Sequence, residues 1–333
     1  MMSPGPLSSA PEALPPSPAG VPPPYAPRQP EPYPYPAGAP VPPVRLSLQP
    51  VPAGLAYDVV SFWEERLPGE VKRTTIEKRI RVAATARPGY LQVSYAADLP
   101  VLRKPDLSSY DHTLLLLAEL YRHLELGVTP AGDITAVLNQ APIEQTWGWV
   151  KQELVRRSGG EDAFTQMLLE GLDEQLPQPG AVRASLRFDY LFGFLLQNVY
   201  EQRFEHGFRY NQPRGFPGFF DNTDLWCRER LEVVAPTRPD RVALRLSGQL
   251  DPARTDLAAV ARQVAAAVQL AGLPEAPAAP VPAPEALRFS YAATCELDAT
   301  TGWPVQVEAS VRCWVPEGYS KEYFIRLEPE PTP

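Results

Sequence analysis

The stretch "GLAYDVVSFWEERLPGEVKRTTIEKRIRVAATA" (residues 54–86) decides the fold class. Apolar and polar side chains alternate along 54–67 and again along 70–86, and the Pro-Gly pair between the two runs supplies a turn. A third run of the same kind, "GYLQVSYAADL" (89–99), follows. Because alternation places one row of side chains on each face, these runs predict an antiparallel sheet with one buried and one solvent-facing side.

The next segments predict helices. "SSYDHTLLLLAELYRHL" (108–124) begins with serines that can cap a helix and continues with enough leucines for a buried face. A hairpin over 124–139 leads to Asn139, the expected cap of a following helix. Four of that helix's side chains form one apolar stripe: Ile143, Trp147, Val150 and Leu154. Trp149 points away from the stripe, and it either belongs to a second buried face or lies at a ligand groove or partner contact.

Two more helices are predicted, over 160–176 and over "AVRASLRFDYLFGFLLQNVYEQRF" (181–204). Residues 183–190 alternate like a strand, but apolar side chains cover every side of a helical wheel from Leu186 to Tyr200, so we interpret 181–204 as a helix. A helix that is apolar all round must be enclosed. We therefore expect a curved sheet to fold around this one.

The aromatic segment "HGFRYNQPRGFPGFFDNTD" (206–224) is predicted as a loop, because Gly215 and Gly218 make its backbone permissive. Such a loop lines or plugs an apolar pocket, or it closes the open end of the sheet over the core. With its neighbours it supplies the candidate ligand-binding side chains, which are Trp149, Phe192, Phe194, Tyr200, Phe204, Phe208 and Tyr210.

The last third of the chain returns to strands, interrupted by an alanine-rich helix (256–272). We predict an α+β fold in which a curved antiparallel sheet from both ends of the chain, a half-open barrel, wraps around a central helical block. The expected single domain spans 44–333. Its parts are strands (44–107), a mainly helical block (108–204), the aromatic loop with strands (205–251), a helix with a Pro/Ala linker (252–286) and C-terminal strands (287–333).

The first 43 residues hold 17 of the chain's 42 prolines and almost nothing to bury, which predicts a disordered, partly polyproline II tail. Pro22-Pro23-Pro24-Tyr25 matches a pattern that WW-type modules bind, but in so proline-rich a segment we favour a plain flexible spacer or tether. The net charge of −8 argues against nucleic-acid binding. No apolar run reaches the roughly 20 residues of a transmembrane helix.

The sequence carries little that indicates catalysis. Its three histidines lie in no metal-ligand spacing, and no nucleophile elbow, P-loop or dinucleotide motif is present. Asp189, among aromatic residues, is expected to pair with Arg183 or Arg187; unpaired and buried, it would have a raised pKa. Cys227, Cys295 and Cys313 read as reduced thiols. We therefore expect a protein that is not an enzyme and holds no metal or cofactor.

The hairpin sequence "CELDATTGWPVQVEASVRC" (295–313) resembles one found in bacterial envelope proteins of the open-barrel carrier type, which include lipoprotein carriers and lipid-binding lipoproteins. That resemblance implies a curved sheet around helices with an apolar cavity. Those carriers are exported, whereas no secretory signal is visible here, so a cytoplasmic location is expected and non-classical export stays open. The chain also resembles uncharacterised Bacteroidota proteins, which implies no activity.

Two functions from different classes follow. The first is a non-enzymatic binding protein, a carrier that holds an apolar ligand inside the half-open barrel. The second is an adaptor or accessory component of a larger bacterial assembly, with the proline-rich tail as a tether. A cavity favours the first, and an exposed apolar patch without a cavity favours the second.

Overall fold

The computed structural model describes residues 44–104, 106–158, 163–178, 180–197, 199–204, 209–220, 223–234, 238–271, 282–316 and 318–330. The predicted tail and most of the predicted Pro/Ala linker lie outside these ranges. Among the described residues, no helix is long and apolar enough to cross a membrane.

The main sheet has 12 strands in the order β7-β6-β4-β3-β2-β14-β13-β12-β11-β10-β9, with β5 paired to β3. Its strands are β2 (Val51–Leu67), β3 (Glu70–Arg87), β4 (Tyr90–Ala97), β5 (Val101–Arg103), β6 (His123–Val128), β7 (Ile134–Val137), β9 (Arg209–Phe220), β10 (Thr223–Val234), β11 (Arg241–Leu250), β12 (Arg288–Asp298), β13 (Pro304–Val315) and β14 (Tyr319–Pro329). A separate two-stranded sheet joins β1 (Val44–Arg45) to β8 (Arg203–Phe204).

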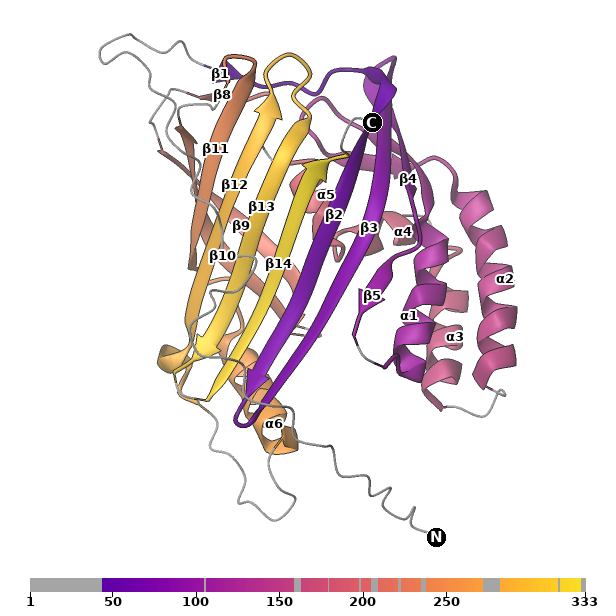
Figure 1. The fold of residues 1–333 in the computed structure, drawn as a ribbon, viewed down its shortest axis with the longest axis vertical. Coiled ribbons are helices and arrows are strands. Elements are labelled where there is room, and N and C mark those ends of the chain that lie inside the picture. The colour runs from indigo at the N-terminus through magenta and orange to yellow at the C-terminus, as the bar shows by residue number, and fades with distance from the viewer. Residues whose placement is uncertain are drawn as a thin grey trace.

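The α-helices are α1 (Ser109–Ala118), α2 (Gln140–Ser158), α3 (Ala163–Gln175), α4 (Ala181–Leu186), α5 (Tyr190–Leu195) and α6 (Leu257–Ala271), with short 3-10 turns at Glu119–Tyr121 and Pro284–Ala286. Figure 1 shows α1, α2 and α3 as a group beside the sheet, whereas α4 and α5 lie behind β2 and β3 in the curve of the sheet.

The sheet joins the two ends of the chain and curves around α5. The C-terminal β14 pairs antiparallel with β2 over Ser320↔Arg66 to Pro329↔Tyr57. The ring of Tyr190 in α5 has its centroid 5.9 Å from that of Trp63 in β2, and 5.7 Å from that of Phe216 in β9. Because strands from distant parts of the sheet contact the same helix, the sheet is strongly curved. In the described strands it stays open, with β7 and β9 as its edges. The predicted fold class is confirmed.

The prediction of one helix over 181–204 is wrong. The chain forms two short helices, α4 and α5. The carboxylate of Asp189 caps α5 by accepting a hydrogen bond from the backbone N–H of Leu191 at 3.0 Å. A cap at Asp189 begins a new helix and so breaks the expected continuous one.

The prediction of a loop over 206–224 is also wrong for its described part. Residues 209–220 form β9, an edge strand paired with β10. Pro213 and Pro217 are compatible with a strand there, because an edge strand needs only one of its two rows of hydrogen bonds. Gly215 packs closely against Trp226, since a Cβ on it would lie 3.0 Å from that ring and the ring would have to shift.

Two local predictions about caps have opposite outcomes. Ser108 caps α1 in a capping box with Asp111, as the sequence predicts. Asn139 does not cap α2 through its side chain, which instead spans to β6: it accepts from the backbone N–H of Glu125 and donates to the carbonyl of His123, each at 2.9 Å. The predicted stripe of α2 is buried.

Candidate functional site

Helices α1, α2 and α3 form a three-helix layer held together by side-chain contacts. The indole N–H of Trp147 in α2 donates to a carboxylate oxygen of Asp173 in α3 at 2.8 Å, and Lys151 pairs with the same carboxylate. Between α1 and α3, the rings of Tyr110 and Phe164 lie 5.6 Å apart. The helices therefore contact one another around a central space.

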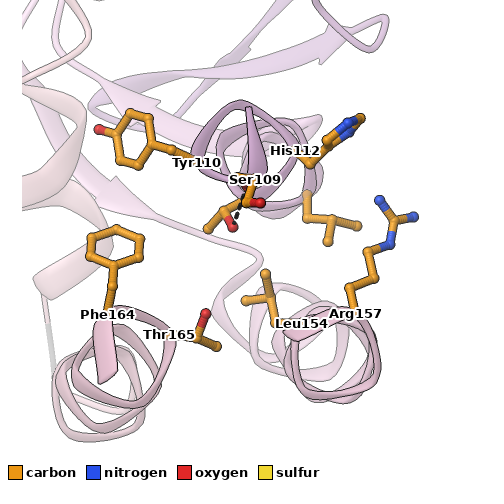
Figure 2. Close-up of a pocket in the computed structure, with 9 residues that line it drawn as sticks. Ser109, Tyr110, His112, Leu154, Arg157, Phe164 and Thr165 are labelled. Carbon is orange, nitrogen blue, oxygen red and sulfur yellow. Dashed lines mark hydrogen bonds between the residues drawn. The ribbon is translucent and has the colours of Figure 1, made fainter. Parts of the chain in front are cut away.

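That space is the largest of the described cavities, with a volume of about 790 Å³. Nine residues line it: Ser109, Tyr110, His112, Thr113, Leu116, Leu154, Arg157, Phe164 and Thr165. Figure 2 shows Leu154 and Thr165 facing the space from α2 and α3, with Tyr110 and Phe164 on one side of it and His112 and Arg157 on the other. A volume of about 300–1,000 Å³ is typical of small-molecule sites.

The aromatic side of the three-helix cavity is exposed to solvent. Tyr110 and Phe164 are 54% and 39% exposed. Leu114, four residues after Tyr110, and Met167, three residues after Phe164, are also exposed. Residues at these spacings share a helix face, so α1 and α3 present a contiguous apolar surface next to the cavity.

The other side of the cavity carries positive charge. Arg157 forms an ion pair with Glu153 at 2.6 Å, and Arg156 pairs with the same carboxylate. Next to the lining, burial would raise the pKa of Asp111, but hydrogen bonds from Lys104 and Ser108 hold it at about 2. Asp111 therefore stays ionised and fixes the first turn of α1, the helix from which five of the lining residues project.

The residues predicted from sequence lie mainly elsewhere. Trp149 is 51% exposed on α2, as its position off the stripe indicates, but it is not among the lining residues. Four others are buried in the core: Phe192, Phe194, Tyr200 and Phe204. Phe192 alone of these lines smaller cavities, of about 470 and 130 Å³. Phe208 and the side chain of Tyr210 lie outside the described residues.

Several of these core aromatics have structural partners. The Tyr200 hydroxyl donates to the carbonyl of Gly302 at 3.1 Å, and the Phe194 ring lies 4.6 Å beneath the guanidinium of Arg214. Arg214 in turn pairs with Glu229, a carboxylate that also accepts from the Tyr291 hydroxyl at 3.0 Å. Burial raises the pKa of Tyr291, which keeps the hydroxyl protonated as a donor. These contacts pack the rings around α5 inside the curve of the sheet, and a ligand role for them stays a prediction.

Several other titratable groups are paired or buried. Asp189 pairs with Lys78 of β3 at 3.4 Å, so the predicted partner, Arg183 or Arg187, was wrong. Cys227, Cys295 and Cys313 are free and buried, and burial raises the pKa of each thiol to about 12. Within the described ranges, no group of three or more His, Cys, Asp or Glu residues could hold a metal ion.

Sequence reasoning missed the three-helix cavity. A signal for it was present, because Tyr110 and Leu114 in α1 and Phe164 and Met167 in α3 are large apolar residues at helical spacing. The sequence does not say which helices meet, so it could not separate a core face from an exposed one.

Comparisons with known proteins do not place the chain in a family. No known family matches the sequence, and no curated protein matches it. A solved structure titled "Lipid-protein interactions in lipovitellin" is similar with a TM-score of 0.42 and 9% identity, over 84% of this chain and 25% of that one. The chain thus spans about a quarter of the length of that protein. The curved antiparallel sheet implied by the hairpin resemblance is observed, whereas an apolar cavity inside it and membership of a carrier family stay predictions.

Proposed function

We propose that this protein is a non-enzymatic binding protein that holds an apolar or amphipathic small molecule in the three-helix cavity. The observation that carries the proposal is the cavity of about 790 Å³, bordered by the exposed rings of Tyr110 and Phe164. An apolar ligand packed against these rings would remove their surface from water, and burying one such side chain stabilises by about 1.5–3 kcal/mol. The proposed site therefore lies in the three-helix layer, whereas the sequence analysis predicted a site inside the curve of the sheet.

The test uses the neutral fluorescent probe N-phenyl-1-naphthylamine with the full chain. We expect saturable binding, weakened about tenfold by Tyr110→Ala or Phe164→Ala, since about 1.4 kcal/mol corresponds to tenfold in affinity. Trp149→Ala is the matched control, because Trp149 is equally exposed on a neighbouring helix but does not line the cavity. A wild-type chain that does not bind, or binding that only Trp149→Ala weakens, contradicts the proposal.

A second candidate, an adaptor, is supported by the same exposed surface. Leu114 and Met167 are 41% and 65% exposed and do not line the cavity, so a helix of a partner protein could cover them. Leu114→Ser with Met167→Ser separates the two functions. Unchanged probe binding together with loss of a partner that co-purifies with the wild-type chain would favour the adaptor.

A further inference from the structure

The charges around the three-helix cavity are unusual for this chain. The sequence has 39 acidic and 31 basic residues, yet none of the nine described lining residues is acidic. Two of them, His112 and Arg157, carry nitrogen groups that donate hydrogen bonds. A lining without a carboxylate favours a ligand with negative rather than positive charge.

These polar groups lie on one side of the cavity only. In Figure 2, Arg157 and His112 lie across the space from Tyr110 and Phe164, with Leu154 between the two sides. A ligand that fills the space would therefore meet apolar rings at one end and a guanidinium at the other. Such an arrangement matches a molecule with a long apolar part and a single polar end.

Arg157 has capacity for a further partner. Its Nε contacts Glu153, and no partner of its two terminal nitrogens lies among the described residues. Arg156 binds the same glutamate through Nε and Nη2, at 2.7 and 2.6 Å. Among the described residues, two cations therefore share one anion at this edge. A planar guanidinium binds a carboxylate through parallel N–H···O bonds.

We infer that the ligand of the three-helix cavity is a single-chain amphiphile with a terminal carboxylate, of the fatty-acid type, whose acid group binds Arg157 and whose chain lies towards Tyr110 and Phe164. This inference rests on the proposed function and adds to it the chemical class and orientation of the ligand. Because Arg157 is the only arginine among the described lining residues and it shares Glu153 with Arg156, the site fits a ligand with a single negative charge.

The experiment compares 11-(dansylamino)undecanoic acid with its methyl ester, which keeps the fluorophore and chain but has no charge. The wild-type full chain is expected to bind the acid about tenfold more tightly, as one charge-assisted hydrogen bond requires. Arg157→Gln should remove that preference by weakening the acid alone. Arg156→Gln is the control, because Arg156 shares Glu153 but does not line the cavity.

Each of the remaining outcomes overturns one named part of the inference. Equal binding of acid and ester by the wild-type chain overturns the carboxylate inference and leaves the proposed function standing. A preference that survives Arg157→Gln, or that Arg156→Gln removes to the same degree, overturns the assigned orientation. If neither probe binds, the proposed function itself fails.

Discussion

Inside the curved sheet, Phe194, Phe204 and Phe219 are no more than 2% exposed, whereas Tyr110, Phe164 and Met167 of the three-helix layer are 54%, 39% and 65% exposed. In the first region the aromatic side chains pack in a core around α5. The second leaves the rings of Tyr110 and Phe164 exposed at the border of a cavity, where burying them would require another molecule. Exposed apolar surface next to a cavity is costly for folding and is typical of binding sites. This difference supports our proposal that the binding site lies in the three-helix layer.

The largest effect should come from the ion pair inside the sheet. Glu229 is 1% exposed and accepts hydrogen bonds from Gln212, Arg214 and Tyr291. Glu229→Leu leaves Arg214 without its counter-charge, so the free energy of unfolding should fall by about 3–5 kcal/mol, measured by urea denaturation. The control is Glu170→Leu on the exposed face of α3, expected within about 0.5 kcal/mol of wild type. Similar losses of unfolding free energy in both variants would contradict the difference in packing between the curved sheet and the three-helix layer.

An intermediate effect is expected at the start of α1. Asp111 has its pKa lowered from 3.8 to about 2 by the hydrogen bonds from Lys104 and Ser108, which outweigh its burial. A carboxylate with a depressed pKa in the folded state stabilises above pH 3.8, and the stability is lost as the pH falls towards 2. Asp111→Asn should lower the unfolding free energy at pH 7 by about 1–2 kcal/mol.

The same variant should lose less stability than wild type between pH 4 and pH 2, because its side chain has no proton to take up. Denaturation curves at a series of pH values test this. Parallel curves for wild type and variant across that window would show that the contacts with Lys104 and Ser108 do not lower the pKa of Asp111 in the folded state.

The smallest expected effect is at Gly171 of α3, and Gly302 in the sheet region provides the contrast. Gly171 lies inside α3 with open space where a Cβ would be, so Gly171→Ala should raise the free energy of unfolding by about 0.5–1 kcal/mol. In the sheet region, Gly302 has a φ of +75°, and a Cβ there would lie 2.5 Å from the carbonyl oxygen of Ser47. Gly302→Ala should therefore destabilise. Thermal denaturation of both variants checks the signs, and a stabilised Gly302→Ala chain would contradict the described turn.

Local patterns in the sequence were enough for most of the fold. The alternation in 54–99 and the stripe from Ile143 to Leu154 each depend on residues close in the chain, and both predictions are confirmed. The edge strand β9 was missed because its prolines and glycines favour loops locally, whereas pairing with β10 and the Trp226 ring over Gly215 decide its structure. Such tertiary contacts cannot be read from one segment.

The site was harder to predict for the same reason. Aromatic density around residues 192–210 indicated a ligand pocket, but the described rings there are those that the sheet encloses as core. The three-helix cavity depends on how α1, α2 and α3 pack against one another, and no single helix carries that information. The polar lining was invisible as well, because Arg157 and His112 are 45 residues apart in sequence and meet only in the fold.

The most direct test of the central claim is hydrogen–deuterium exchange of the full chain with and without N-phenyl-1-naphthylamine. If the three-helix layer is the binding site, the probe slows exchange in α1, the second half of α2 and α3, and leaves α5, β9 and β10 unchanged. Protection of α5 and β9 with no change in α1 and α3 would contradict the account, and would return the ligand to the curve of the sheet around Phe192.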